Sequence, residues 1–167
     1  MTMETDLDTL PEQAQQHIRN LTLAPHPEGG WYRRIHTGTV PVTRPDGTER
    51  PGITLIHYLL PRGQFSAWHR VDGDEIWHFL DGAPLTLHHL QESGDYQALS
   101  LGPSPGHLPV AVIPAWDWQA ATPGGAWTLV ACAVGPGFDF NGFALLRDHP
   151  EEQQCLRQRG SNLLDLL

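Results

Sequence analysis

The sequence predicts an all-β fold of the barrel or sandwich class, and three observations favour that class. Its 15 Pro and 17 Gly are more than a helical bundle accommodates, because both residue types interrupt regular helices. Turn signals recur roughly every ten residues, which is the spacing of short strands in such folds. The runs between the turns are β-branched or alternate apolar and polar residues, as β-strands do. A length of 167 residues predicts one domain.

The first expected element is a short helix over residues 11–21, where apolar residues recur at helical spacing. Residues 37–51 are polar and contain Pro45-Asp-Gly47, so a surface hairpin or flap is expected there. Residues 150–167 are charged, and we expect a tail with a short helix at best and a mobile end. The strands are expected at residues 31–36, 53–60, 64–71, 74–80, 84–90, 96–101, 110–113 and 127–134.

Composition excludes several classes of function. The formal net charge is −9, so the surface repels phosphate backbones and anionic lipid, and we expect neither a nucleic-acid nor a membrane partner. All ten basic residues are Arg, which excludes a lysine Schiff base and a P-loop lysine. No apolar run is long enough to span a bilayer, and no basic signal segment is found, so a cytoplasmic location is expected. Cys132 lies in an apolar run and is expected to be a small buried hydrophobe.

Residues 63–82 contain the strongest candidates for catalytic residues in the chain. His69 and Glu75 stand on either side of the tight turn Val71-Asp-Gly-Asp74, with alternating apolar residues flanking it. This pattern predicts a hairpin that points both polar groups into one interior. Histidine carries protons near neutral pH and a nearby carboxylate orients it, so we interpret the two residues as a candidate catalytic acid–base pair. The alternative is a buried hydrogen-bonded pair that only specifies the hairpin.

The predicted interior is mostly apolar, which is the usual composition of a small-molecule site. Phe65, Trp77 and Phe79 share the inward phase of the two strands. A Trp at such a position either stacks on a flat or sugar ring of a ligand or packs in the core. Glu28 precedes Gly29-Gly30, and it either caps backbone amides or lines the pocket.

Arginines and histidines complete the candidate set. Arg33, Arg34 and Arg70 are suited to an anionic substrate group, because Arg binds a carboxylate or phosphate bidentately; a solvated strand face is the alternative. His78 is expected on the outward face of its strand, and the direction of His57 stays open. Trp116 or Trp118 offers a further stacking surface, again with core packing as the alternative. The histidines that fit no ligand spacing are interpreted as surface residues: His88, His89, His107 and His149.

Residues 63–82 resemble the first motif of the cupin superfamily. That motif reads Gly, five residues, His, one residue, His, three or four residues, Glu, six residues, Gly. Gly63, His69, Glu75 and Gly82 stand at these places, whereas Val71 occupies the place of the second His. The chain therefore keeps the outline of the motif and lacks one of its side chains.

A second resemblance covers residues 112–119, which are similar to the second cupin motif around Pro114. Gln119 stands at the place of that motif's His, and Trp116 at the place of its Gly. More closely, the chain is similar to a small single-domain branch of cupins of unknown function. The likeness covers most of residues 20–145 and rests on five segments in order: Pro27-Glu-Gly-Gly30, Trp68-His-Arg-Val-Asp72, Asp74-Glu-Ile-Trp-His78, Pro114 with Trp118-Gln-Ala-Ala121, and Gly135-Pro-Gly-Phe-Asp-Phe140.

The resemblance implies one cupin domain over residues 1–167, a double-stranded β-helix, or jelly-roll barrel, with its core at about residues 20–145. It also implies a homodimer in which the amino-terminal strand pairs with the partner's sheet. Metal-binding cupins use three His and one Glu, which suit Mn, Fe, Ni or Zn. Because this chain keeps only one His and the Glu, we expect no firmly held cofactor; a divalent transition metal, if bound, would use His69, Glu75 and Gln119.

Three functions are consistent with these residues. The first is a metal-independent epimerase, isomerase or dehydratase for a sugar-nucleotide-like or other small polar substrate, which uses His69 and Glu75. Its link to sugar-nucleotide epimerases is an analogy between barrels. The second is a non-catalytic binder of a small ligand, and the third is a metal-dependent oxygenase, isomerase or lyase. The pocket in each case is expected to include Phe65, Trp77, Phe79, Gln119, Glu28 and Arg70.

Overall fold

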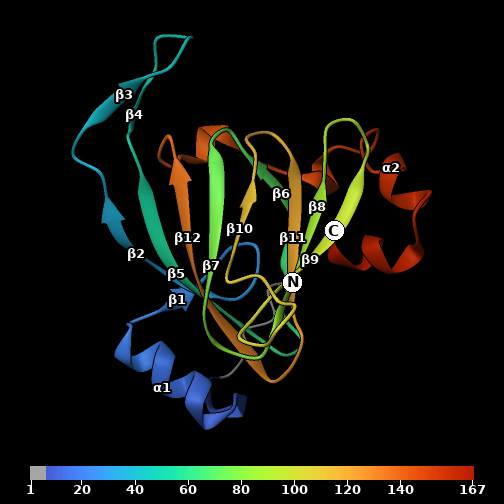
Figure 1. The fold of residues 1–167 in the computed structure, drawn as a ribbon. Helices are drawn as coiled ribbons and strands as arrows, with labels where there is room; N and C mark the ends of the chain where they lie inside the picture. Colours follow the sequence, from blue (N-terminus) through green and yellow to red (C-terminus); the bar gives the residue numbers. More distant parts are fainter. Residues whose placement is uncertain (1–6) are drawn as a thin grey trace.

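Two antiparallel β-sheets face each other in the computed structural model, which describes residues 7–167 (Figure 1). The first six residues, which the sequence assigns to the same domain, lie outside the described part. The six-stranded sheet runs in the order β1 (Ala24–Pro25), β2 (Trp31–Thr37), β5 (Thr54–Pro61), β12 (Trp127–Gly135), β7 (Asp74–Gly82), β10 (Val110–Ile113). The five-stranded sheet runs in the order β13 (Phe143–Leu145), β6 (Ser66–Val71), β11 (Trp118–Pro123), β8 (Leu85–Leu90), β9 (Tyr96–Leu101). The prediction of an all-β jelly roll is confirmed.

Strands β6 and β7 do not pair with each other, so the predicted hairpin at residues 63–82 is wrong. β6 pairs with β11 and β13 in one sheet, while β7 pairs with β12 and β10 in the other. The turn at residues 71–74 is a corner at which the chain passes from one sheet to the facing one. Gly73 in this corner lies against the backbone at the end of β12, where an added Cβ would come within 2.7 Å of the Pro136 carbonyl oxygen. A hairpin turn and such a corner show the same alternation, because both reverse the strand direction.

The main core lies between the sheets and is built from the inward residues of both. In the six-stranded sheet, Tyr58, Trp77 and Val130 point inward and are almost fully buried. The five-stranded sheet contributes Leu85, Leu87 and Ala121 from the opposite side. The inward phase of each strand alternates with an outward phase, as the pleat requires.

The helix α1 (Glu12–Asn20) covers part of the outer face of the six-stranded sheet, at one end of the barrel (Figure 1). Its buried Ala14 and Ile18 pack in a cluster with Leu59 of β5 and Leu129 of β12. The helix begins after Pro11, which suits a residue that lacks a backbone N–H, and a short 3-10 turn, Leu7–Thr9, precedes it. The predicted helix over residues 11–21 is confirmed to within one residue at each end.

The carboxyl-terminal tail packs on the outside of the five-stranded sheet, whereas the sequence predicts a mobile end. It contains the 3-10 turn Leu146–Asp148, the helix α2 (Gln154–Arg157) and the 3-10 segment Ser161–Leu166. Leu156 is fully buried, and the indole of Trp68 donates a hydrogen bond of 2.9 Å to the Leu163 carbonyl. The prediction of a mobile end gave too much weight to the charged residues of the tail. Leucines between those charged residues cover an apolar patch on the sheet.

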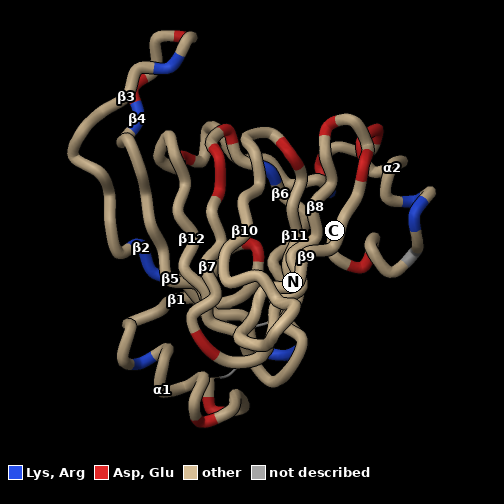
Figure 2. The backbone as a smooth tube through the Cα atoms, viewed as in Figure 1, with Lys and Arg blue, Asp and Glu red and all other residues tan. Residues whose placement is uncertain are grey.

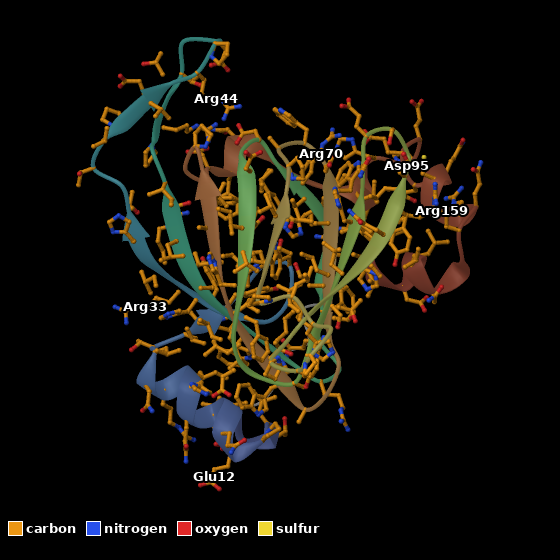
Figure 3. The ribbon with its side chains drawn as sticks, in the orientation of Figure 1. Glu12, Arg33, Arg44, Arg70, Asp95 and Arg159 are labelled. Carbon is orange, nitrogen blue, oxygen red and sulfur yellow. The ribbon has the colours of Figure 1, made fainter. Side chains whose placement is uncertain are left out.

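The strands β3 (Pro41–Thr43) and β4 (Glu49–Pro51) form the predicted surface hairpin, which projects from the end of the barrel opposite α1 (Figure 1). The side chain of Arg44 reaches back from this hairpin toward the barrel (Figure 3), where its Nη1 lies 3.4 Å from the Asp72 carboxylate. Acidic positions gather in several loops at this same end of the barrel (Figure 2). Within residues 7–167, no helix has the length and apolar character needed to cross a membrane.

Candidate functional site

A cavity of about 320 Å³ opens between the two sheets and contains the polar groups of the barrel interior. Its volume lies at the lower end of the range for small-molecule sites. The strands β2, β5, β6, β7 and β12 supply most of its walls, and the segment after β12 supplies an aromatic side. The lining residues are His26, Glu28, Tyr32, Arg34, Thr54, Ile56, His69, Val71, Glu75, Cys132, Val134, Phe138, Asp139, Phe140 and Phe143.

His69 and Glu75 meet in this cavity, each carried by a different sheet. His69 points inward from β6 and Glu75 points inward from β7, with His69 Nε2 lying 3.9 Å from Glu75 Oε2. The other ring nitrogen, Nδ1, lies 2.8 Å from the Ala67 carbonyl oxygen. Because a carbonyl only accepts hydrogen bonds, Nδ1 carries a proton. Both side chains are more than nine-tenths buried.

Glu28 completes an acidic shell around the imidazole. Its Oε2 lies 3.4 Å from His69 Nδ1, and its Oε1 accepts a hydrogen bond of 2.8 Å from the Ser66 hydroxyl. The chain can turn Glu28 into the barrel because Gly29 and Gly30 both have positive φ angles, at 107° and 76°. An added Cβ on Gly29 would overlap the Phe65 carbonyl oxygen. Of the two alternatives for Glu28, the structure therefore places it in the pocket lining.

The flanking carboxylates control the protonation of His69. Burial alone would lower the pKa of its imidazole, but the charge of Glu28, the Glu75 carboxylate and the Ala67 carbonyl together raise the pKa to about 9. The side chain is therefore an imidazolium at neutral pH, held between two carboxylates. A group in this state is suited to donate a proton or to stabilise a developing negative charge.

Gln119 lies behind Glu75 and holds it in place. Its amide Nε2 donates a hydrogen bond of 2.6 Å to Glu75 Oε2, and its Oε1 accepts one of 2.8 Å from the Trp77 indole. The amide oxygen of Gln119 is thus directed at Trp77 and away from His69. Gln119 and Trp77 support the site from the core, and neither forms part of the cavity lining.

His26 also lines the cavity, although no motif in the sequence predicted it as a site residue. Burial lowers its pKa below the ordinary value, although the nearby charge of Glu28 opposes that effect. Its Nδ1 accepts a hydrogen bond of 3.2 Å from the Glu28 backbone N–H, so the neutral ring carries its proton on Nε2. The only feature of the sequence that could have indicated a role for His26 is its position directly before Pro27-Glu-Gly-Gly30. The site thus pairs a charged histidine with a neutral one.

Three phenylalanines form the aromatic side of the cavity. Phe138, Phe140 and Phe143 contact one another edge to face, with ring centroids 5.0–6.0 Å apart. Phe143 also stacks on His69 at 5.6 Å, and the guanidinium of Arg34 lies 5.8 Å from the Phe138 ring. Their place in the cavity wall could not be inferred from their spacing in the sequence.

The other predicted pocket residues lie elsewhere. Phe79 packs against the main core next to Trp77, beyond the cavity lining. Phe65 packs on the outer side of the five-stranded sheet, against the cluster that contains Trp68. Arg70 follows His69 in β6, so strand alternation sends it to the face opposite the cavity. From the predicted set, the structure therefore brings His69, Glu75, Glu28 and Arg34 to the cavity, with Gln119 behind Glu75.

Arg70 belongs instead to an outer depression beside the tail. Its guanidinium stacks 4.4 Å from the Trp118 ring centroid, and its Nη1 pairs with Glu152 Oε2 at 3.0 Å. Trp118 is buried, and its indole donates a hydrogen bond of 2.7 Å to the same Glu152 oxygen. Trp116 is 48 % exposed at the edge of this depression. Arg70 thus forms an ion pair with Glu152 that holds the carboxyl-terminal tail against the sheet.

The histidines outside the cavity also differ in part from expectation. His89 is interpreted from sequence as a surface residue, but it is buried and lies 2.7 Å from Asp117 Oδ2. His88 is partly buried and bonds to the Tyr96 hydroxyl at 2.9 Å. His57 and His78 both lie on the outer face of the six-stranded sheet, so the expectation for His78 is confirmed and the direction of His57 is settled.

The donor set does not fit a transition metal of the cupin type. Glu28 and Glu75 face opposite nitrogens of the His69 ring, so the three side chains do not converge on one point. The amide oxygen of Gln119 accepts from Trp77, and Val71 offers no donor atom. Among the described residues, no group of three or more His, Cys, Asp or Glu is arranged to hold a metal ion.

The jelly-roll fold with a polar cluster between its sheets defines the chain as a cupin. The family model described as "Cupin superfamily (DUF985)" matches residues 15–146, and the chain belongs to this family. A hypothetical protein from Leishmania major is 28% identical with a TM-score of 0.75, and the match covers 87% of this chain and 97% of that one. A protein from Shewanella oneidensis is 29% identical with a TM-score of 0.73, over 84% and 92% of the two chains.

A more distant similarity extends to an enzyme. Oxalate decarboxylase from Bacillus subtilis is 15% identical with a TM-score of 0.55, and the match covers 73% of this chain and 29% of that one. At this identity the likeness concerns the fold alone. The search of curated proteins found no match for the chain.

Proposed function

We propose that this cupin binds a small polar molecule between its sheets and transfers a proton to and from it without a metal, as an epimerase, isomerase or dehydratase does. The observation that carries the proposal is the state of the two facing groups. His69 is an imidazolium whose Nε2 faces Glu75 Oε2 at 3.9 Å, which is beyond the length of a direct hydrogen bond. Both groups line the cavity, so a ligand can reach them.

Glu75 is the base in this proposal. Its Oε2 accepts from Gln119, whereas its Oε1 has no hydrogen-bond partner in the described part of the chain. The Oε1 atom is therefore free to take a proton from a substrate carbon next to a carbonyl. His69 Nε2–H then hydrogen-bonds the carbonyl oxygen as negative charge develops on it. Glu75 then exchanges this proton with solvent and returns a proton to the same carbon or to the neighbouring carbon, which restores the carboxylate and balances the reaction.

The remaining polar residues position this pair. Glu28 and the Ala67 carbonyl fix the His69 ring through Nδ1, so that Nε2 is the nitrogen that faces the ligand. Gln119 fixes the Glu75 carboxylate. A small substrate is favoured over a complete sugar nucleotide, because the cavity volume of about 320 Å³ is near the lower limit for ligand sites.

Deuterium exchange tests the proposal without knowledge of the natural substrate. Small aldoses, ketoses and keto acids are incubated with the protein in D₂O, and loss of the C–H signal next to the carbonyl is followed by NMR. We expect His69→Gln and Glu75→Gln each to reduce exchange about 100-fold or more. The exposed His36→Gln and Glu49→Gln are the matched controls. Full exchange in both site variants would show that the pair is not the acid and base.

A non-catalytic binder is the second candidate function. The specific observation in its favour is that the cavity has one continuous aromatic side, made by Phe138, Phe140 and Phe143. Such a surface supports affinity without contributing to proton transfer. A compound that binds tightly while its exchange rate stays at the uncatalysed level would favour this function. A metal-dependent reaction is the third hypothesis, and stoichiometric metal in protein purified without an affinity tag would favour it.

The homodimer is also proposed, and the outer face of the six-stranded sheet supports it. Val110 and Val112 are 40% and 51% exposed on β10, next to the half-buried Ile76 of β7. On the same face, the Nδ1 atom of His57 is shielded from solvent and has no partner within residues 7–167. The helix α1 covers only one end of this face. A second copy of the chain would bury the rest.

A further inference from the structure

The cavity lining includes an exposed guanidinium, that of Arg34, which the proton-transfer chemistry does not use. Arg34 points inward from β2 opposite Ile56, and it lines the cavity. Its side chain contacts the Phe138 ring at 5.8 Å, and within residues 7–167 this is the only ring, hydrogen-bond or ion-pair contact of the guanidinium. By contrast, Arg33 points to the outer face from the neighbouring position (Figure 3). Of the three arginines considered for anion binding, only Arg34 is in the cavity.

An aromatic track connects Arg34 with the acid–base pair. The guanidinium lies over Phe138, the Phe138 and Phe143 centroids are 5.9 Å apart, and Phe143 stacks on His69 at 5.6 Å. A ligand that binds Arg34 at one end therefore extends along the apolar ring surfaces, and its other end reaches His69. Rings of this kind favour a flat or apolar body over a hydrated one.

The two polar ends of the track are well separated. In the six-stranded sheet, β5 and β12 lie between the strands that carry Arg34 and Glu75. Three strand intervals correspond to roughly 14 Å between the two backbones at the usual spacing. The rings of Phe138 and Phe143 lie between the guanidinium and the His69 ring along this track. An acid whose body covers these rings therefore fits the track better than a two-carbon acid does.

The charges of the lining favour a ligand with one negative charge. The lining contains the three carboxyl groups of Glu28, Glu75 and Asp139, against one guanidinium and the imidazolium of His69. A second negative charge on the ligand would face this excess of carboxyl groups. A carboxylate matches the fork of Arg34 in two parallel hydrogen bonds and brings only one charge.

We propose that the cavity takes a monocarboxylic acid with a flat apolar body, whose carboxylate binds Arg34 and whose opposite end lies at His69 and Glu75. The body lies along Phe138 and Phe143. This inference names the ligand class of the proposed proton-transfer site and rests on that function for the role of its inner end. The binding of the carboxylate itself requires no turnover.

Calorimetry with phenylbutanoate and the corresponding alcohol, phenylbutanol, tests the proposal. We expect the acid to bind the wild-type protein about 10-fold or more tightly than the alcohol, which is the usual effect of a charge-assisted hydrogen bond. Arg34→Gln removes this preference, while Arg33→Gln, its matched control on the outer face, keeps it. Phe138→Ala weakens the binding of acid and alcohol alike. Thermal unfolding of each variant checks that the fold is retained.

The opposite results separate this inference from the proposed function. Equal affinity for acid and alcohol, a preference that survives in Arg34→Gln, or no binding of either compound would overturn it. Tighter binding of phenyl phosphate than of phenylbutanoate would contradict the preference for a single charge. Glu75→Gln is expected to keep the preference for the acid while it loses deuterium exchange. Loss of the carboxylate preference with intact exchange would reject the ligand class alone.

Discussion

The pKa of His69 results from its partners. The same residue on an exposed strand face would titrate near 6.5, and burial by itself would lower that value. Glu28 and Glu75 reverse the direction, and the first of them is available only because Gly29 and Gly30 turn the chain inward. The chemical character of the site thus depends on residues that carry no reactive group.

A pH dependence of stability follows from His69. Because its pKa is raised from 6.5 to about 9 in the folded protein, the folded state holds its proton more tightly than the unfolded state. The resulting stabilisation is fully present below pH 6.5 and is lost as the pH rises through about 9. Its size is on the order of 3 kcal/mol. Urea unfolding between pH 6.5 and 9 is expected to show a steeper decline for wild type than for His69→Gln, and identical slopes would contradict this assignment.

The turn at Gly29 offers a second prediction at the residue scale. Gly29→Ala is expected to destabilise the protein by about 3 kcal/mol or more, because the new Cβ would meet the Phe65 carbonyl at an unfavourable φ angle. Gly47→Ala is the matched control, since Gly47 also has a positive φ but has nothing within 4 Å. The control should cost about 1–2 kcal/mol. Equal values by chemical denaturation would mean that the close approach is unimportant.

Some residues of the site could be predicted and others could not. His69, Glu75 and Glu28 could be predicted from the sequence because they stand in short motifs in which polar groups are unusual among apolar neighbours. Arg34 was indistinguishable from Arg33, since their phase depends on the register of β2 against β5. His26 precedes a proline in an irregular segment, where no periodicity indicates direction. Whether a residue of an irregular segment lines the cavity depends on tertiary contacts, which the local sequence does not show.

At the scale of elements, strand positions followed from the sequence while strand partners did not. The apolar runs and turn residues placed most of the strands to within a few residues. The pairing of β6 with β11 and β13 joins segments about 50 and 75 residues apart, and no local pattern contains that information. The β8–β9 hairpin, by contrast, was predictable because its turn and its partner are adjacent.

The β3–β4 hairpin gives a prediction at this scale. Asp72, in the corner between β6 and β7, is buried and pairs with Arg44 and Arg50 of the hairpin at 3.4 and 3.3 Å. Asp72→Asn removes the buried counter-charge that both guanidinium groups share, with only Asp139 left 3.9 Å from Arg50, and is expected to cost about 2 kcal/mol. Amide exchange in residues 41–51 should accelerate as well. The exposed Asp148→Asn should change neither quantity, and an unchanged hairpin in Asp72→Asn would show that other contacts fix it.

At the scale of the whole molecule, the two faces of the six-stranded sheet have different roles. The inner face carries the cavity and the core, and the outer face exposes valines that a single copy leaves uncovered. Light scattering after gel filtration is expected to give twice the mass of one chain. Val112→Arg should shift the protein toward the monomer, because it places a charge in the interface. Val40→Arg, on the projecting hairpin where Val40 is 72% exposed, is the control. A wild-type monomer would contradict the proposed dimer.

The corner between β6 and β7 has a further consequence for the chemistry. His69 and Glu75 are close in sequence, yet they belong to different sheets. The distance between their side chains therefore depends on the distance between the two sheets. That distance is set by the residues that fill the interior, such as Tyr58, Trp77 and Leu87. The geometry of the proposed acid–base pair therefore depends on the separation of the two sheets. A change of volume deep in the core would alter the rate of proton transfer more than the affinity for a ligand.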